Sequence, residues 1–82
     1  MLSQRQTFIN KTQLPLEVYI EPTPDRYVLA PQSRMVVEAE YKKGQEPFTV
    51  IVQDGAITVY PAIWPLNVWI DGEKAEPNWS LP

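Results

Sequence analysis

The 82-residue chain contains no cysteine and no histidine, and its three glycines are isolated from one another. Without these residue types it can form no disulfide, no thiolate or imidazole metal site, and no Cys-His or Ser-His-Asp catalytic group. A glycine-rich phosphate loop is missing too. Seven basic and ten acidic residues give a net charge of −3, whereas nucleic-acid surfaces are basic. We therefore expect no metal, no cofactor and no nucleic-acid partner.

Long hydrophobic runs are also absent. The most apolar window, residues 59–70, is too short to span a bilayer and is interrupted by two prolines and an asparagine, so we expect no membrane partner. The first six residues are polar, and no apolar segment of the kind found in a secretory signal follows them. A cytoplasmic location is the default expectation, although a secreted chain whose signal had been removed would have the same features.

The hydrophobic pattern has a period of two, and no window shows helical spacing. Residues 16–20 and 35–41 alternate between apolar and polar side chains, which is typical of strands with one solvated face. Nine prolines leave few stretches long enough for a helix. Further runs of β-forming residues occupy residues 7–9, 26–30, 48–53, 56–60 and 68–70. The sequence predicts an all-β fold, a small antiparallel sandwich or partly open barrel of six to seven short strands.

A tight hairpin is the most specific local prediction. Asp54 and Gly55 separate two β-branched runs, and this dipeptide favours a two-residue type I′ turn. Asp71 and Gly72 form either a second tight turn or the exit of the last strand. The alternation ends after them, so we expect a single β domain at residues 1–72 and a C-terminal tail at residues 73–82.

The alternation also assigns the two faces of the strands. The predicted core residues are Leu16, Val18, Ile20, Met35, Val37, Phe48, Val50 and Val52. The residues predicted to face outward are Glu17, Glu38, Glu40 and Thr49.

Residues 8–18 (FINKTQLPLEV) and 27–31 (YVLAP) combine an Asn-x-Thr turn, an apolar strand and a proline-anchored turn. This arrangement resembles the opening strands of immunoglobulin-like sandwiches of the major-sperm-protein and pilus-chaperone type. It is also similar to small uncharacterised bacterial all-β proteins. The resemblance covers residues 8–40, about 40% of the chain. It implies a sandwich fold and carries no function with it.

Four carboxylates are the candidates for chemistry. Glu17 and Glu21 share one strand face, and Glu38 and Glu40 share another, so the four would converge if their strands were neighbours. Paired carboxylates perform acid–base catalysis or hold a hard cation. The simpler interpretation is a solvated outer face, and we expect no enzyme and no catalytic residue. The sequon that begins at Asn10 is most simply a turn.

Aromatic residues gather between residues 60 and 69. Tyr60, Ile63, Trp64 and Trp69 lie there among two prolines, and Trp79 stands in the tail beside Leu81. An exposed cluster of this kind is typical of a surface for a partner protein or a sugar ring. Alternatively, Trp64 closes one end of the sandwich, Trp69 lies in or near the core, and the tail docks on the body.

These contrasts lead to one functional expectation and one alternative. Catalytic residue types are missing while Trp, Tyr and Pro are plentiful. This contrast favours a non-catalytic module for protein–protein interaction or self-assembly, whose partner is another protein or a second copy in a homo-oligomer. The predicted contact residues are Tyr60, Ile63, Trp64, Trp69 and Trp79. The alternative is a carbohydrate- or small-ligand-binding β module that uses Trp64 and Tyr60 as a stacking surface.

Overall fold

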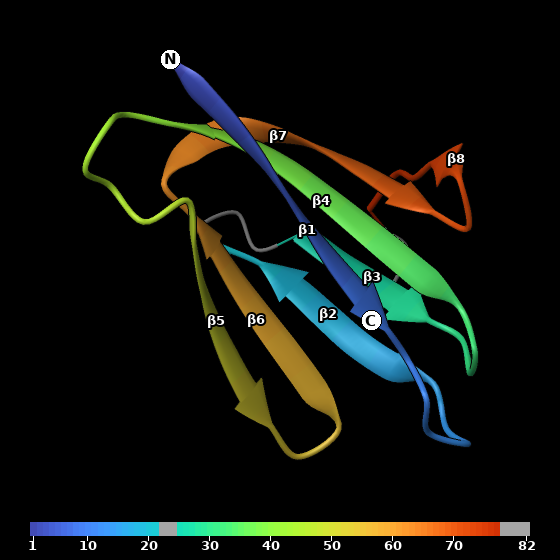
Figure 1. Ribbon diagram of the computed structural model, residues 1–82. Coiled ribbons are helices and arrows are strands. Elements are labelled where there is room, and N and C mark those ends of the chain that lie inside the picture. Colours follow the sequence, from blue (N-terminus) through green and yellow to red (C-terminus); the bar gives the residue numbers. More distant parts are fainter. Residues whose placement is uncertain (22–24, 78–82) are drawn as a thin grey trace.

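The structure, a computed structural model, describes residues 1–21 and 25–77, apart from the side chains of residues 64–66 (Figure 1). The eight strands are β1 Leu2–Ile9, β2 Leu16–Ile20, β3 Asp25–Leu29, β4 Arg34–Tyr41, β5 Phe48–Gln53, β6 Ala56–Pro61, β7 Ile63–Ile70 and β8 Glu73–Lys74. The predicted all-β class is confirmed, with β8 as a short strand beyond the expected number. In the described part of the chain, no helix is long and apolar enough to cross a membrane.

The strands form two sheets that face each other as a sandwich. Sheet A has the order β1-β4-β7-β8, and all its neighbouring strands are antiparallel. Sheet B has the order β3-β2-β6-β5, in which β2 and β6 run parallel. The chain therefore leaves sheet B after β3 to form β4, returns to sheet B for β5 and β6, and completes sheet A with β7 and β8 (Figure 1).

The predicted hairpin is confirmed in its loop length and register. Gln53 pairs with Ala56 across the two-residue loop. Of the two loop residues only Gly55 has a positive φ, 69°, so the type I′ geometry predicted for this turn is wrong. Both loop residues of the β7–β8 hairpin have positive φ, 51° at Asp71 and 84° at Gly72. The type I′ turn is therefore found in the β7–β8 hairpin. The Asp71 carboxylate supports it by accepting hydrogen bonds from the Arg34 N–H and the Ser33 hydroxyl, each of 2.9 Å.

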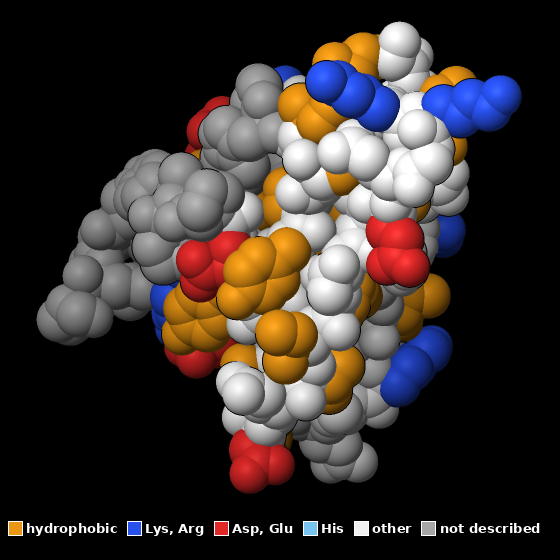
Figure 2. Space-filling model, turned by 90° about the vertical axis from the view of Figure 1, so that its left-hand side faces the viewer, with side chains coloured by type: hydrophobic (Ala, Val, Ile, Leu, Met, Phe, Trp, Pro, Cys, Tyr) orange, Lys and Arg blue, Asp and Glu red, His pale blue; other side chains and the backbone are white. Residues whose placement is uncertain are grey.

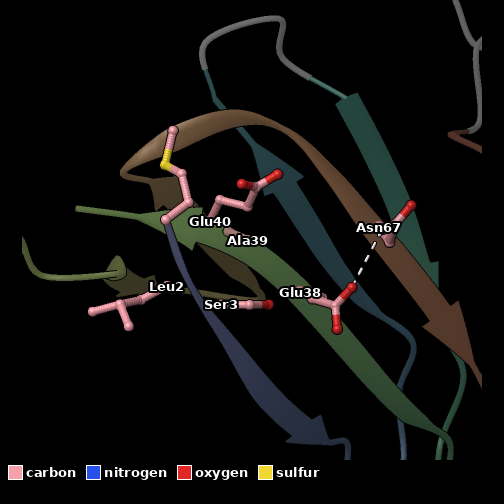
Figure 3. A pocket seen from close by; sticks show the side chains of 7 residues that line it. Leu2, Ser3, Glu38, Ala39, Glu40 and Asn67 are labelled. Carbon is pink, nitrogen blue, oxygen red and sulfur yellow. Dashed lines mark hydrogen bonds between the residues drawn. The ribbon is translucent and has the colours of Figure 1, made fainter. Parts of the chain in front are cut away.

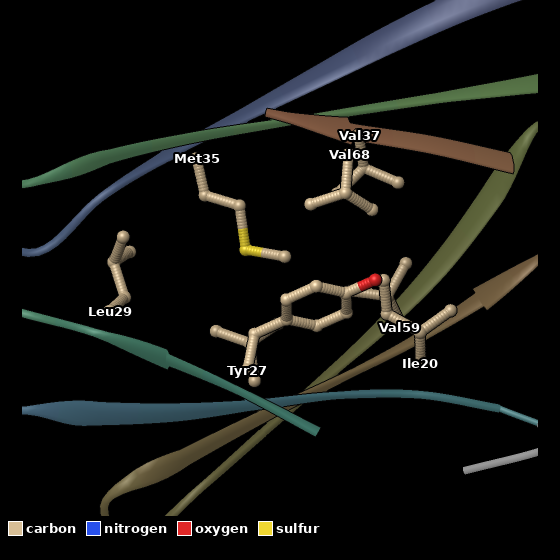
Figure 4. Close-up of a cluster of buried hydrophobic side chains, with 8 residues drawn as sticks. Ile20, Tyr27, Leu29, Met35, Val37, Val59 and Val68 are labelled. Carbon is tan, nitrogen blue, oxygen red and sulfur yellow. The ribbon is translucent and has the colours of Figure 1, made fainter. Parts of the chain in front are cut away.

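The core lies between the sheets and draws on both (Figure 4). Its buried members are Val18, Ile20, Tyr27, Leu29, Met35, Val37, Val59 and Val68. The alternation in residues 16–20 and 35–41 predicted the faces of β2 and β4 correctly, because Val18, Ile20, Met35 and Val37 are all buried. Leu16 and Phe48 pack against this core and are partly buried.

The expectation that Val50 and Val52 lie in the core is wrong. Their side chains are 37% and 75% exposed. Both point to the inner side of sheet B, since they pair directly with Val59 and Ile57 of β6. However, β5 is the last strand of its sheet and lies outside the area that sheet A covers (Figure 1). Their face was predicted correctly, but nothing in the described structure covers it.

Asn10 joins the two sheets where β1 ends. It is 1% exposed, and its Nδ2 donates to the carbonyls of Leu14 (2.8 Å) and Leu29 (2.9 Å). Its Oδ1 accepts bonds from the backbone N–H (2.9 Å) and the hydroxyl (2.7 Å) of Thr12. The predicted turn at the sequon is thus confirmed, and the amide nitrogen is fully engaged. These bonds connect the end of sheet A to the end of β3 in sheet B.

We expect Asn10→Ala to lower the free energy of unfolding by about 2–4 kcal/mol. The change removes four side-chain hydrogen bonds and leaves the buried Leu29 carbonyl without its partner. Urea unfolding followed by circular dichroism measures this loss. Lys11→Ala, an exposed change in the same turn, should have almost no effect. Equal stabilities of the two variants would contradict the structural role of Asn10.

Tyr27 links stability to alkaline pH. Burial, together with the negative charges of Asp25 and Glu76, raises the pKa of Tyr27 from 10 to about 12. The folded state thus keeps this proton to higher pH than the unfolded state does, and the resulting stabilisation is complete below pH 10 and lost as pH rises toward 12. We expect wild type to lose about 2–3 kcal/mol more than Tyr27→Phe over this range, measured by urea unfolding at each pH. Parallel pH curves for the two proteins would contradict this assignment.

Candidate functional site

The predicted contact residues lie on opposite sides of the sandwich. Tyr60 is 43% exposed on the outer face of sheet B, because its neighbour Val59 points into the core. Trp69 is partly buried on the outer face of sheet A, because its neighbour Val68 points into the core. The chain crosses from one sheet to the other between β6 and β7. Tyr60 and Trp69 therefore do not share a surface.

Other predicted contact residues lie at or beyond the limits of the described structure. Ile63 is partly buried at the start of β7, opposite Glu40. The backbone of Trp64 belongs to β7, where the pairing with β4 shifts register between Glu38 and Glu40. The side chain of Trp64 and the whole of Trp79 lie outside the described residues. Their roles as contacts stay predictions.

A polar network crosses the outer face of sheet A. Arg5 of β1 forms an ion pair with Glu38 of β4, with 2.9 Å between Nε and Oε2. Asn67 of β7 donates to the other carboxylate oxygen of Glu38 (3.3 Å) and accepts a bond from Lys74 of β8 (3.1 Å). The Arg5 guanidinium also lies over the Trp69 ring, 5.1 Å from its centroid. All four strands thus contribute to one connected surface.

Two shallow hollows flank this network. One, of about 260 Å³, lies beside Glu38, which points toward Asn67 (Figure 3). The other, of about 680 Å³, is lined by Arg5, Arg34, Val36, Trp69, Asp71 and Gly72. The hydrogen bond from Arg5 and, to a smaller extent, the one from Asn67 lower the pKa of Glu38. The first hollow therefore presents an ionised carboxylate whose two oxygens already have partners.

The four carboxylates do not converge. Glu17 and Glu21 belong to sheet B and its end, whereas Glu38 and Glu40 lie on the outer face of sheet A. Glu17 is instead paired with Arg26 on the neighbouring strand and accepts a bond from the Tyr19 hydroxyl (2.9 Å). Among the described residues, no group of three or more acidic side chains is close enough to hold a metal ion. The solvated-face interpretation fits this arrangement.

The edge strand β5 carries a run of three consecutive exposed hydrophobic residues. Val50, Ile51 and Val52 are all exposed, and no residue of β5 is charged. Each of the other sheet edges carries charge: Arg5 on β1, Asp25 and Arg26 on β3, and Glu73 and Lys74 on β8. Figure 2 looks onto the side of the molecule where β5 lies and shows hydrophobic side chains gathered on its lower part. We use the name β5 edge for strand Phe48–Gln53 together with its border that is not paired with β6.

The hydrogen-bond pattern shows which backbone groups of the β5 edge are free of β6. Beyond the start of the strand, the Ala62 N–H donates to the Pro47 carbonyl (2.9 Å). Polar backbone groups alternate sides along an antiparallel strand, so the odd-numbered residues of β5 bond to β6. The N–H and C=O groups of Phe48, Val50 and Val52 are therefore directed away from the sheet. They form a regular row of donors and acceptors at its border.

Sequence reasoning did not identify the β5 edge as a surface, because it assigned Val50 and Val52 to the core. A six-residue run with high β propensity and no charge, proline or glycine was the available signal. Such a run is equally typical of a buried central strand. No family model matches the chain, and no curated protein or solved structure is significantly similar to it.

We expect Glu38→Gln to leave the fold and neutral-pH stability almost unchanged, because the pair with Arg5 is exposed to solvent. The substitution should change stability only at acid pH. The lowered pKa of Glu38 gives a stabilisation that is present above the unfolded value near 4.5 and lost as pH falls through the folded value. Thermal unfolding between pH 7 and pH 2 should therefore show a weaker acid dependence in the variant. A variant as unstable at pH 7 as a core mutant would indicate another role for this carboxylate.

Proposed function

We propose that this protein is a non-catalytic module for protein–protein interaction or self-assembly. The observation that carries the proposal is the β5 edge, an uncharged strand whose outer backbone groups and apolar side chains face solvent. Proteins ordinarily protect such edges with charge, proline or a covering segment, because an open strand accepts another strand. An added strand would bond to the free backbone groups, and its side chains would cover Val50 and Val52.

The neighbouring strand extends this surface. Tyr60 of β6 pairs with Thr49 of β5, which places its ring on the outer face of sheet B beside the β5 edge. Ile51, which is 41% exposed, lies on the same outer face, two residues after Thr49 in β5. A partner strand would thus meet apolar side chains on both faces of β5. Among the predicted contact residues, Tyr60 belongs to this surface, and Trp64 and Trp79 are proposed to extend the contact.

Ligand binding is the second candidate, and the hollow beside Trp69 favours it. Trp69 lies there with two arginines and Asp71. Arg5 already covers part of one face of the indole, which leaves less of the ring for a sugar to stack on. The stacking pair expected from the sequence, Tyr60 with Trp64, does not include this residue. We therefore rank the carbohydrate- or small-ligand-binding function below the interaction module.

Val52→Lys tests the interaction function. Val52 is 75% exposed, so the substitution should leave the fold intact while placing a charge where a partner strand would pack. We expect at least a tenfold loss of association, measured as self-association by sedimentation velocity and as capture of partners from a lysate of the source cells. Thr7→Lys adds the same charge to the exposed edge strand β1 and should leave association unchanged.

The outcome depends on comparing the two variants. If Val52→Lys associates as wild type does in both assays, the β5 edge is not the interaction surface and the proposal is overturned. If a glycan array binds wild type and Val52→Lys equally while neither associates with protein, the ligand-binding alternative takes its place.

A further inference from the structure

We infer that the occupant of the β5 edge is a second copy of this chain, paired antiparallel to it about a two-fold axis that passes through Val50. This inference rests on the proposed function and specifies its partner. The result would be a dimer in which two copies of sheet B form one continuous sheet. Because each copy contributes its β5 edge to the same contact, the assembly closes at two subunits instead of growing into a fibre.

The row of free backbone groups is symmetric about Val50. A two-fold axis perpendicular to an antiparallel sheet places one residue opposite itself in the partner. With Val50 on that axis, Phe48 lies opposite the partner's Val52, and the N–H and C=O groups of all three outward-directed residues find partners. With Ile51 on the axis, Phe48 would lie opposite the turn residue Asp54 and its pairing would be lost. The hydrogen-bond pattern therefore selects the Val50 register.

The side chains agree with this register. On the inner side of the sheet, the exposed Val52 would pack against the partner's Phe48, and the two copies of Val50 would lie side by side. Aromatic and β-branched residues are favourable cross-strand neighbours. The pairing thus covers the most exposed apolar side chain of β5 with the aromatic ring that bounds the same strand.

Charge also permits self-pairing. Residues 47–53 contain no charged side chain, so two copies bring no like charges together within the paired segment. The nearest charges, Glu46 and Asp54, are exposed just beyond its two ends. In the Val50 register each Glu46 lies toward the partner's Asp54, and this repulsion is screened by salt. We therefore expect dimerisation to strengthen when salt is raised. A contact built on opposite charges would weaken instead.

Single cysteines test the register directly, because the natural chain has none. Directly opposed residues in a hydrogen-bonded pair have Cα atoms about 5.5 Å apart, within the range of a disulfide. Oxidised Val50→Cys should therefore form covalent dimers on a non-reducing gel. Val52→Cys is the matched control, since in this register its Cα lies about 14 Å from that of the partner's residue 52. We expect at least tenfold slower cross-linking for this control.

Proline provides the second test. Val50→Pro removes an N–H that is directed at the partner and keeps every bond between β5 and β6, so we expect a folded monomer. Thr7→Pro makes the same change on β1, whose odd-numbered residues also face outward because the Asn10 N–H bonds to Ser33 (3.1 Å). Sedimentation velocity over a wide concentration range should show dimers of a 9.4 kDa chain for wild type and Thr7→Pro only. Val50→Pro should weaken dimerisation at least tenfold.

The outcomes separate this inference from the proposed function. If Val52→Cys cross-links as fast as Val50→Cys, or if Val50→Pro dimerises as wild type does, the two-fold pairing at Val50 is overturned. The interaction function still stands in that case, provided that Val52→Lys reduces association. If wild type stays monomeric at millimolar concentration and yet captures a partner through Val52, the function stands and the partner is not a second copy. If Val52→Lys changes nothing, both fail.

Discussion

The buried side chain of Asn10 is the connection on which the relative placement of the two sheets depends. Its amide bonds to the Leu14 and Leu29 carbonyls, while its own backbone bonds to Gln32 and Ser33. These contacts bring the end of β1, the entry to β2 and the turn before β4 to one point. Such a junction suits a chain without cysteine, because hydrogen bonds must then hold the sheets in place of disulfides.

The unequal overlap of the two sheets explains the surface that we assign to function. Sheet A covers the inner faces of β2, β3 and β6 well enough to bury Val18, Leu29 and Val59. It ends before β5, so the same alternating pattern that buries side chains elsewhere leaves Val52 in solvent. A domain of this size gains only a few kcal/mol from its own core. Covering the β5 edge by association would add apolar contact where the single chain cannot provide it.

The outer faces show a second division of roles. Sheet A carries ion pairs and amide bonds that run across all four of its strands, from Arg5 to Lys74. Such exposed pairs contribute little stability each, but they keep the face and its β1 and β8 edges polar. The β5 edge has no such protection. This contrast between the two sheets is the physical reason to propose an interaction at the β5 edge.

The sequence by itself determined the features that depend on neighbouring residues. Alternation assigned the faces of residues 16–20 and 35–41, the Asp54-Gly55 dipeptide predicted a hairpin with the correct register, and the Asn-x-Thr segment predicted a turn. Each of these follows from strand geometry or turn chemistry within a few residues.

Only the tertiary structure decided what covers each face. Val50 and Val52 have the same pattern as the buried valines of β2 and β4, and nothing local reveals that β5 is an edge beyond the reach of sheet A. Tyr60 and Trp69 are close in sequence, yet they lie on opposite faces because the chain changes sheets between them. Two pairs of glutamates separate for the same reason. Strand order arises from long-range pairing, which a periodicity of two does not encode.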